Sequence, residues 1–210
     1  FFKVSLRAIL RASHYGNVMI MYPMISSLEE IYKANEILDE AKRELASKNI
    51  PFDENIKVGI MVEVPSTAVM ADMLIDEVDF FSIGTNDLIQ YTVAVDRLNP
   101  TVSKLYSFYN PGVIRLIKKT IDSAKDKKDK FVGMCGEMAA DPLAIILLVG
   151  LGLQEFSVNA SMVLKAKKLI SMIDSKKAVL IANKVLTLKT AKEVEAYLDG
   201  EAKKIYGKYY

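Results

Sequence analysis

The chain has 210 residues, of which 51% are hydrophobic and 26% are charged, and this composition is typical of a packed globular protein. Its 28 basic and 26 acidic residues leave a formal net charge of +2, which argues against a surface dedicated to nucleic acid. A single cysteine excludes an internal disulfide bond and favours a reducing compartment, so we expect a cytoplasmic protein. No apolar run reaches the roughly 18 residues of a membrane-spanning helix, so membrane insertion is not expected.

Five short apolar runs, each followed by a helical pattern, predict alternating strands and helices. The expected strands cover residues 18–24, 56–64, 79–85, 131–137 and 155–160. The first helix after a strand is expected to begin at Ser27, with Glu30 completing a capping box, and to reach about Ser47. Later helices are expected to begin near Pro65, Asn86, Asn110 and Asp141, and at a second capping box formed by Thr190 and Glu193.

This alternation predicts an α/β protein with a parallel sheet that is buried on both faces. Two architectures fit the pattern, namely an open doubly wound sheet and part of a (β/α)8 barrel. A complete barrel needs eight strands, so five strands are too few for one. No repeat or low-complexity segment interrupts the chain, and we expect residues 1–210 to form a single domain.

Polar residues follow four of the expected strands at their carboxyl ends. They are Glu63, the turn Gly84-Thr85-Asn86-Asp87, the stretch Cys135-Gly136-Glu137, and the stretch Ser157-Val158-Asn159. In parallel α/β folds the carboxyl ends of the strands line the active site, so these groups are expected to converge.

Two carboxylates on neighbouring strand ends, Glu63 and Asp87, suit a hard cation such as Mg²⁺. The alternative is that they are solvated loop carboxylates or helix caps, because Asn86 and Asp87 stand where an N-cap residue is expected. The same turn runs into a helix N-terminus, where free N–H groups and the helix dipole favour an anion such as phosphate.

Arg97 and Cys135 each leave two roles open. Arg97 suits a bidentate clamp for phosphate or carboxylate, and equally an ion pair with Asp96 or Asp79. Cys135 stands between glycines that leave room for a ligand, and it suits either a small buried hydrophobe or a proton donor or nucleophile. The residues alone therefore indicate a magnesium-dependent α/β enzyme that acts on a small phosphorylated or carboxylated substrate.

The stretches FFSIGTNDLIQYTVAVDR and GMCGEMAADP resemble the C-terminal domain of Enzyme I of the bacterial phosphoenolpyruvate-dependent sugar phosphotransferase system. The resemblance extends along nearly the whole chain through LRAILRAS, IMYPMISSLEE, VGIMVEVPSTA, LIKKTIDSA and GLGLQEFSVNA. Pyruvate phosphate dikinase and phosphoenolpyruvate synthase are similar in the same barrel and are the alternatives. The AVDR ending of the first stretch is closer to Enzyme I.

The resemblance implies a phosphoenolpyruvate/pyruvate-type TIM (β/α)8 barrel, of which this chain covers about the last five strands. It also implies transfer of phosphate from phosphoenolpyruvate to a protein histidine with release of pyruvate, the first step of sugar uptake, with Mg²⁺ as cofactor. By motif, Glu63 and Asp87 are the metal ligands, and Asn86, Asp87 and Arg97 contact phosphoenolpyruvate. Cys135 is then the acid that protonates the enolate carbon of pyruvate.

The resemblance leaves out the first three strands of the family's barrel, and the sequence does not begin with methionine, so we expect a fragment of a longer protein. The substrate arginines on those strands have no counterpart here, and Arg7 and Arg11 do not match them. We therefore expect a half-made site with a weakened phosphate clamp, and no turnover by the fragment alone. The alternative is a fragment that serves only in binding or dimerisation.

The partners that the resemblance implies are the phosphohistidine domain of the same parent enzyme, a histidine-containing carrier protein, and a second copy of the chain in a homodimer. The single histidine of the chain, His14, is not in the motif of the phosphorylated histidine and is given no role.

Overall fold

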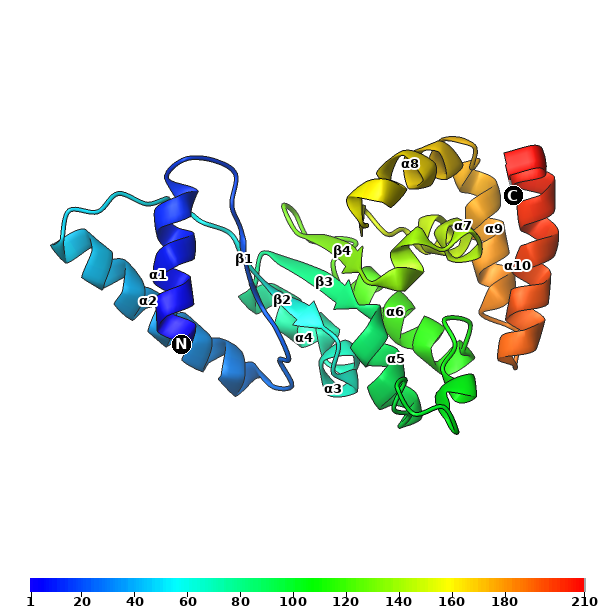
Figure 1. Cartoon of the computed structure of the whole chain (residues 1–210), viewed down its shortest axis with the longest axis horizontal. Coiled ribbons are helices and arrows are strands. Elements are labelled where there is room, and N and C mark those ends of the chain that lie inside the picture. The colour runs from blue at the N-terminus through cyan, green and yellow to red at the C-terminus, as the bar shows by residue number, and fades with distance from the viewer. Residues whose placement is uncertain (210) are drawn as a thin grey trace.

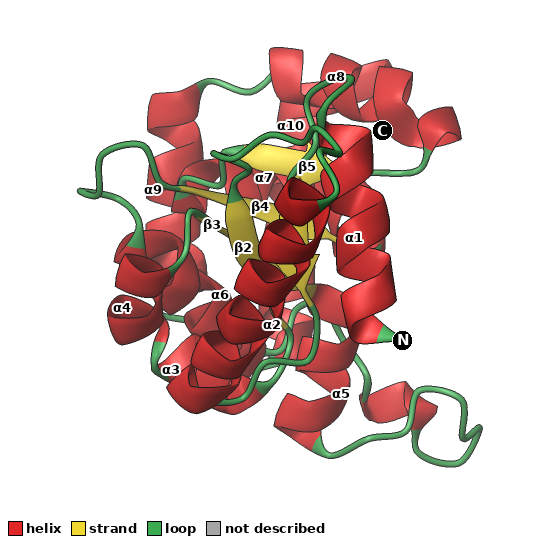
Figure 2. Ribbon diagram, turned by 90° about the vertical axis from the view of Figure 1, so that its left-hand side faces the viewer, coloured by secondary structure: helices red, strands yellow, loops and turns green. Residues whose placement is uncertain are grey.

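The computed structural model describes residues 1–209, with the backbone alone at residue 208. One parallel sheet runs through the molecule in the order β1-β2-β3-β4-β5 (Figures 1 and 2). Each strand lies within one of the five predicted apolar runs. The strands are β1 (Ile20–Tyr22), β2 (Val58–Val62), β3 (Phe80–Gly84), β4 (Phe131–Cys135) and β5 (Glu155–Ser157).

The strand order decides between the two predicted architectures. Each strand pairs in parallel with the strands that precede and follow it in the sequence. A doubly wound sheet contains a reversal of strand order, whereas consecutive order is that of a (β/α)8 barrel wall. The fold is therefore α/β, with five strands of such a barrel, and the predicted fold class is confirmed.

The helices follow the strands as the alternation predicts. In chain order they are α1 (Phe2–Ser13), α2 (Leu28–Ser47), α3 (Pro65–Val69), α4 (Ala71–Leu74), α5 (Thr85–Val93), α6 (Pro111–Ser123), α7 (Pro142–Leu151), α8 (Val163–Ser171), α9 (Ser175–Val185) and α10 (Ala191–Tyr206). In Figure 1, α1 and α2 lie side by side at one end of the molecule, and α9 and α10 lie together at the other. Ion pairs from Lys3 and Arg7 to Glu44 hold α1 against α2.

The predicted helix caps are confirmed at three of four helices. The side chains of Asn110 and Asp141 accept backbone N–H groups of α6 and α7, and Thr190 forms its capping box with Glu193. The box predicted at Ser27 is wrong, because the Ser27 side chain accepts no backbone N–H of α2. The carboxylate of Glu30 instead accepts a hydrogen bond of 2.6 Å from the backbone N–H of Ser26, the residue before the N-cap residue Ser27.

The two faces of the sheet differ in burial. The face covered by helices carries fully buried apolar side chains on every strand from β1 to β4: Ile20, Tyr22, Ile60, Val62, Phe81, Ile83, Val132 and Met134. On the other face Met21, Glu155 and Ser157 are exposed, and Ser82 and Cys135 are half-buried. The prediction that both faces of the sheet are buried is therefore confirmed for one face only. The other face stays partly exposed, because five strands do not close into a barrel around it.

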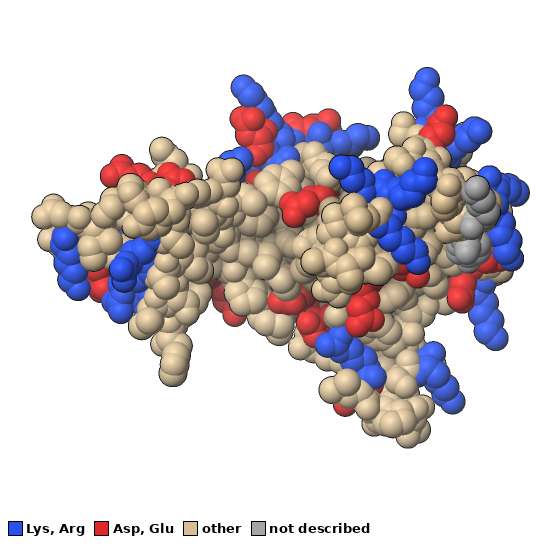
Figure 3. Space-filling model, turned by 45° about the horizontal axis from the view of Figure 1, so that its top comes forward, with Lys and Arg blue, Asp and Glu red and all other residues tan. Residues whose placement is uncertain are grey.

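Charged side chains of both signs are interspersed on the surface that Figure 3 shows. Among the residues described, no helix combines the length and the apolar character that crossing a membrane requires.

Candidate functional site

The turn after β3 places Asn86 and Asp87 in the first turn of α5. That helix begins at Thr85 with Gly84 as its N-cap residue, so Asn86 and Asp87 are its second and third residues. The predicted start at Asn86 is one residue late, because Gly84 still pairs with Cys135 as the last residue of β3. The alternative that Asn86 or Asp87 is the N-cap is therefore wrong.

Glu63 follows β2 directly and is buried, with only 4% of its surface exposed. Its Oε1 accepts a hydrogen bond of 2.7 Å from the backbone N–H of Met24, which lies in the loop after β1. Its Oε2 lies over the end of β3, where a Cβ added to Gly84 would stand 2.9 Å from it. The carboxylate is thus held between the ends of three neighbouring strands.

Electrostatics make this carboxylate a candidate cation ligand. Burial raises the pKa of Glu63, the hydrogen bond from Met24 opposes that rise, and the negative charge of Asp87 adds to it. None of the ion pairs between described residues includes Glu63 or Asp87. Two neighbouring carboxylates, one of them buried, would both be stabilised by a bound cation.

The donor set fits Mg²⁺ in particular. Mg²⁺ takes one or two protein carboxylates and completes its octahedron with waters and substrate oxygens. Within residues 1–209 no three histidine, cysteine, aspartate or glutamate side chains gather into a metal-binding cluster. Glu63 and Asp87 therefore suit a metal that needs few protein ligands, in contrast to structural zinc, which takes four.

Cys135 ends β4, and its side chain is half-buried. The hydroxyl of Ser82 donates to its Sγ at 3.5 Å, and its carbonyl accepts from the hydroxyl of Thr85 at 3.4 Å. The next residue, Gly136, has a φ of +112°, and a Cβ there would stand 2.4 Å from Thr85 Oγ1. Only glycine therefore lets the chain turn so close to the start of α5.

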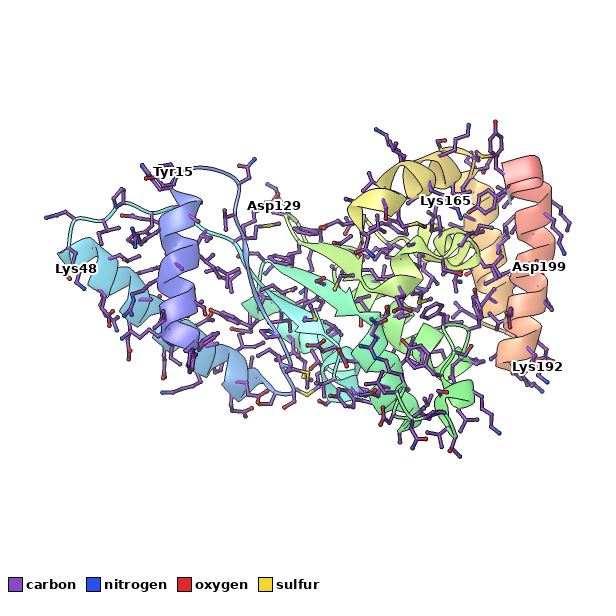
Figure 4. The ribbon with its side chains drawn as sticks, viewed as in Figure 1. Tyr15, Lys48, Asp129, Lys165, Lys192 and Asp199 are labelled. Atoms are coloured by element: carbon purple, nitrogen blue, oxygen red, sulfur yellow. The ribbon has the colours of Figure 1, made fainter. Side chains whose placement is uncertain are left out.

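A cavity of about 680 Å³ opens beside Cys135. Its polar lining comes from the ends of β3, β4 and β5 and from α8: Asn86, Cys135, Glu137, Asp141, Ser157, Asn159 and Lys165. The structure thus brings polar groups from three strand ends to one cavity. Among the described residues, Glu63, Asp87 and Arg97 lie outside its lining. Sequence reasoning did not single out Lys165, which lines the cavity and is labelled in Figure 4, because Lys165 does not directly follow a strand.

Arg97 follows α5 in the sequence and lies alongside the face of that helix that carries Asn86. The helix ends at Ala94, which adopts a left-handed conformation with a φ of 52°. The chain then folds back, and the backbone N–H of Arg97 donates to the side chain of Gln90 at 3.3 Å. Gln90 stands four residues after Asn86 and therefore on the same face of the helix.

Tyr106 bonds to Asn86 near Arg97, and sequence reasoning missed it. Its hydroxyl donates to Oδ1 of Asn86 at 3.3 Å. Burial raises the pKa of the Tyr106 hydroxyl, and the charge of Glu137 raises it further, while the charge of Arg97 lowers it. Because Tyr106 lies in a loop, away from every strand end, no spacing rule pointed to it.

The alternative ion pairs predicted for Arg97 are wrong. Within the described part of the chain, the Arg97 side chain forms no ion pair with Asp79 or Asp96. The carboxylate of Asp79 accepts the backbone N–H of Val58 at 2.7 Å, and that of Asp96 accepts the N–H of Leu98 at 2.8 Å. Both carboxylates therefore bond to backbone N–H groups, that of Asp79 on the neighbouring strand β2 and that of Asp96 within its own loop.

Residues 1–175 match the family described as PEP-utilising enzyme, PEP-binding domain. The chain belongs to this family. It is 51% identical over 193 residues to a phosphoenolpyruvate-protein phosphotransferase of Listeria monocytogenes, a match that covers 92% of this chain and 34% of the relative. It is also 51% identical over 197 residues to the Bacillus subtilis protein of the same name, covering 94% and 34%. The chain thus spans about a third of the length of these relatives, and the family predicted from the motifs is confirmed.

A solved structure supports the fold independently. The crystal structure of a citrate lyase from Burkholderia xenovorans LB400 superposes with a TM-score of 0.60 at 16% sequence identity. The match covers 96% of this chain and 68% of that chain. At so low an identity the likeness bears on the fold alone, and it agrees with the consecutive parallel strands described above.

The left-handed turn at Ala94 leads to a first prediction. Replacing Ala94 with glycine should stabilise the chain by about 1 kcal/mol, because a Cβ is disfavoured in this conformation. The matched change Ala8→Gly, at an exposed position in the middle of α1, should instead cost about 1 kcal/mol. Urea unfolding of both variants measures the difference. Equal losses would show that Ala94 is not left-handed and that the chain does not fold back there.

The buried carboxylate leads to a second prediction. Because folding raises the pKa of Glu63, its contribution to stability is present below the ordinary glutamate pKa and is lost as the pH rises through the raised value. Without metal at neutral pH, Glu63→Gln should therefore unfold at a higher urea concentration than the wild type. This advantage should disappear near pH 4, where both side chains are uncharged.

The control for this prediction is Glu77→Gln, which changes an exposed glutamate and should leave the unfolding midpoint unchanged at both pH values. A neutral-pH midpoint for Glu63→Gln below that of the wild type would mean that the Glu63 charge is stabilised in the metal-free fold.

Proposed function

We propose that this chain is the phosphoenolpyruvate-binding part of a phosphoenolpyruvate-protein phosphotransferase. The observation that carries the proposal is the buried Glu63 carboxylate beside Asp87, at the strand ends where the motifs MVEVP and GTND stand. The parent enzyme would transfer the phosphate of phosphoenolpyruvate to a histidine on a separate domain and release pyruvate. The 51% identity to phosphotransferases supports this choice over a dikinase or a synthase.

Glu63 and Asp87 are the proposed ligands of Mg²⁺. Bound there, Mg²⁺ supplies positive charge that neutralises the phosphate and enolate oxygens of the substrate. The part of this chain is to hold the two carboxylates in place, through the N–H of Met24 and the glycine at position 84.

Asn86, Asp87 and Arg97 form the proposed substrate site. The first N–H groups of the nine-residue helix α5 and the Asn86 side chain suit an anionic phosphate. Arg97 lies alongside the same face and can offer its guanidinium as a bidentate donor. These groups position the phosphate and balance its charge, and such positioning accounts for most of the catalysis of phosphoryl transfer.

Cys135 is the proposed acid. Departure of the phosphoryl group to histidine leaves the enolate of pyruvate, and the thiol gives its proton to the methylene carbon, which becomes the methyl group. The resulting thiolate recovers a proton from solvent. The Ser82 hydroxyl, which donates to the sulfur, is placed to stabilise that thiolate.

The parent enzyme would be cytoplasmic and would work as a homodimer, with residues 1–210 as a single domain. The phosphohistidine domain of the same parent enzyme would accept the phosphate and pass it to a histidine-containing carrier protein. The name of the relatives supports the part of this proposal in which phosphate passes from phosphoenolpyruvate to a protein.

Calorimetric titration of phosphoenolpyruvate into the chain, with and without Mg²⁺, tests the proposal. We expect binding that requires Mg²⁺ and that weakens at least about tenfold in Glu63→Gln and in Asp87→Asn, since each removes one metal-binding charge. Glu77→Gln, an exposed control, should bind as the wild type does.

Two results would contradict the proposal. One is phosphoenolpyruvate binding that both site variants retain in full. The other is a lack of binding that persists after the strands expected to precede this segment are restored. If restoring those strands recovers binding, the weakness lies in the missing arginines, and the assignment stands.

A further inference from the structure

We propose that Tyr106 is a positioning residue, whose hydroxyl fixes the side chain of Asn86 in the arrangement that receives the phosphate. This inference rests on the proposed function and adds a residue that the sequence did not single out. Its basis is the hydrogen bond from the phenolic hydroxyl to Asn86, beside the positive charge of Arg97.

The chemistry of the two groups fixes the direction of this hydrogen bond. An amide oxygen can only accept, so the phenol of Tyr106 is the donor. The phenolic proton then points to an acceptor, and Oδ1 of Asn86 lies 3.3 Å away. With its oxygen engaged by Tyr106, Asn86 presents its NH₂ group as a free pair of donors. An amide oriented in this way offers an anion at the start of α5 donors, without the repulsion of a carbonyl oxygen.

Tyr106 is itself fixed to the scaffold by a series of aromatic contacts. Its ring meets Phe108 edge-on at 6.0 Å, and Phe108 meets Tyr109 edge-on at 6.3 Å. The Tyr109 hydroxyl donates to Asp141 at 2.8 Å, and Asp141 caps the helix α7. Phe108 also lines the cavity beside Cys135. The hydroxyl of Tyr106 is therefore held by a rigid element, although Tyr106 lies in a loop.

A single substitution can distinguish a positioning role of Tyr106 from a packing role. Tyr106→Phe keeps the ring and its contact with Phe108 but removes the hydroxyl that orients Asn86. A residue that only packs would lose little in this variant, or would lose stability and all ligand binding together. A positioning residue would lose affinity for the anionic substrate alone.

The test compares the wild type with Tyr106→Phe and with Tyr32→Phe, a matched control at an exposed position on α2. The first measurement is NMR of the Asn86 carboxamide in the free chain, through its nitrogen-15 heteronuclear NOE. The second is calorimetry of Mn²⁺ alone and of phosphoenolpyruvate with Mg²⁺.

We expect the Asn86 NOE to be close to backbone values in the wild type and in Tyr32→Phe, and to fall clearly in Tyr106→Phe. Affinity for phosphoenolpyruvate should fall about tenfold in Tyr106→Phe, which is the effect of one lost hydrogen bond to a charged site. Affinity for Mn²⁺ alone and the unfolding temperature should match those of the control.

An Asn86 NOE in Tyr106→Phe equal to that of the control overturns the inference, whatever the ligand data show. Equal loss of Mn²⁺ and phosphoenolpyruvate affinity also overturns it, since that result indicates a packing role. If the NOE falls but no form of the chain binds phosphoenolpyruvate, even with the preceding strands restored, the hydroxyl orients Asn86 and the proposed substrate is wrong.

Discussion

The burial of the Glu63 carboxylate beside Asp87 is the constraint on which the rest of the site depends. A buried carboxylate is costly unless hydrogen bonds or an opposite charge stabilise it. Here one oxygen accepts the N–H of Met24, and the other lies over Gly84, where any side chain would collide with it. The loops after three consecutive strands are thus arranged around one carboxylate, and a bound cation would offset its cost.

Helix α5 connects this carboxylate to the remaining polar groups. Its first turn carries Asp87 toward Glu63 and Asn86 toward the cavity beside Cys135. Its last turn ends in a left-handed residue, Ala94, that sends the chain back along the helix. One short helix therefore brings together the proposed cation ligand Asp87, a helix N-terminus proposed to face the phosphate, and the returning Arg97, which stands ten residues after Asp87 in the sequence.

Sequence reasoning predicted the strands well, because uninterrupted apolar runs bounded by polar residues leave few other structures open. The alternation of strands and helices could not decide the strand order, because a doubly wound sheet and a barrel share that alternation. Sequence reasoning placed the start of α5 at Asn86 from N-cap preference, but pairing of Gly84 with Cys135 sets the start at Thr85. Tyr106 was beyond its reach, because the contact with Asn86 exists only once the loop has folded back.

The most direct test of this account is the position of Mn²⁺, used in place of Mg²⁺, in crystals of the chain by anomalous scattering. The account predicts one strong peak within about 2.5 Å of a carboxylate oxygen from Glu63 and of one from Asp87. Peaks confined to surface carboxylates, with Glu63 bonded only to Met24, would contradict it.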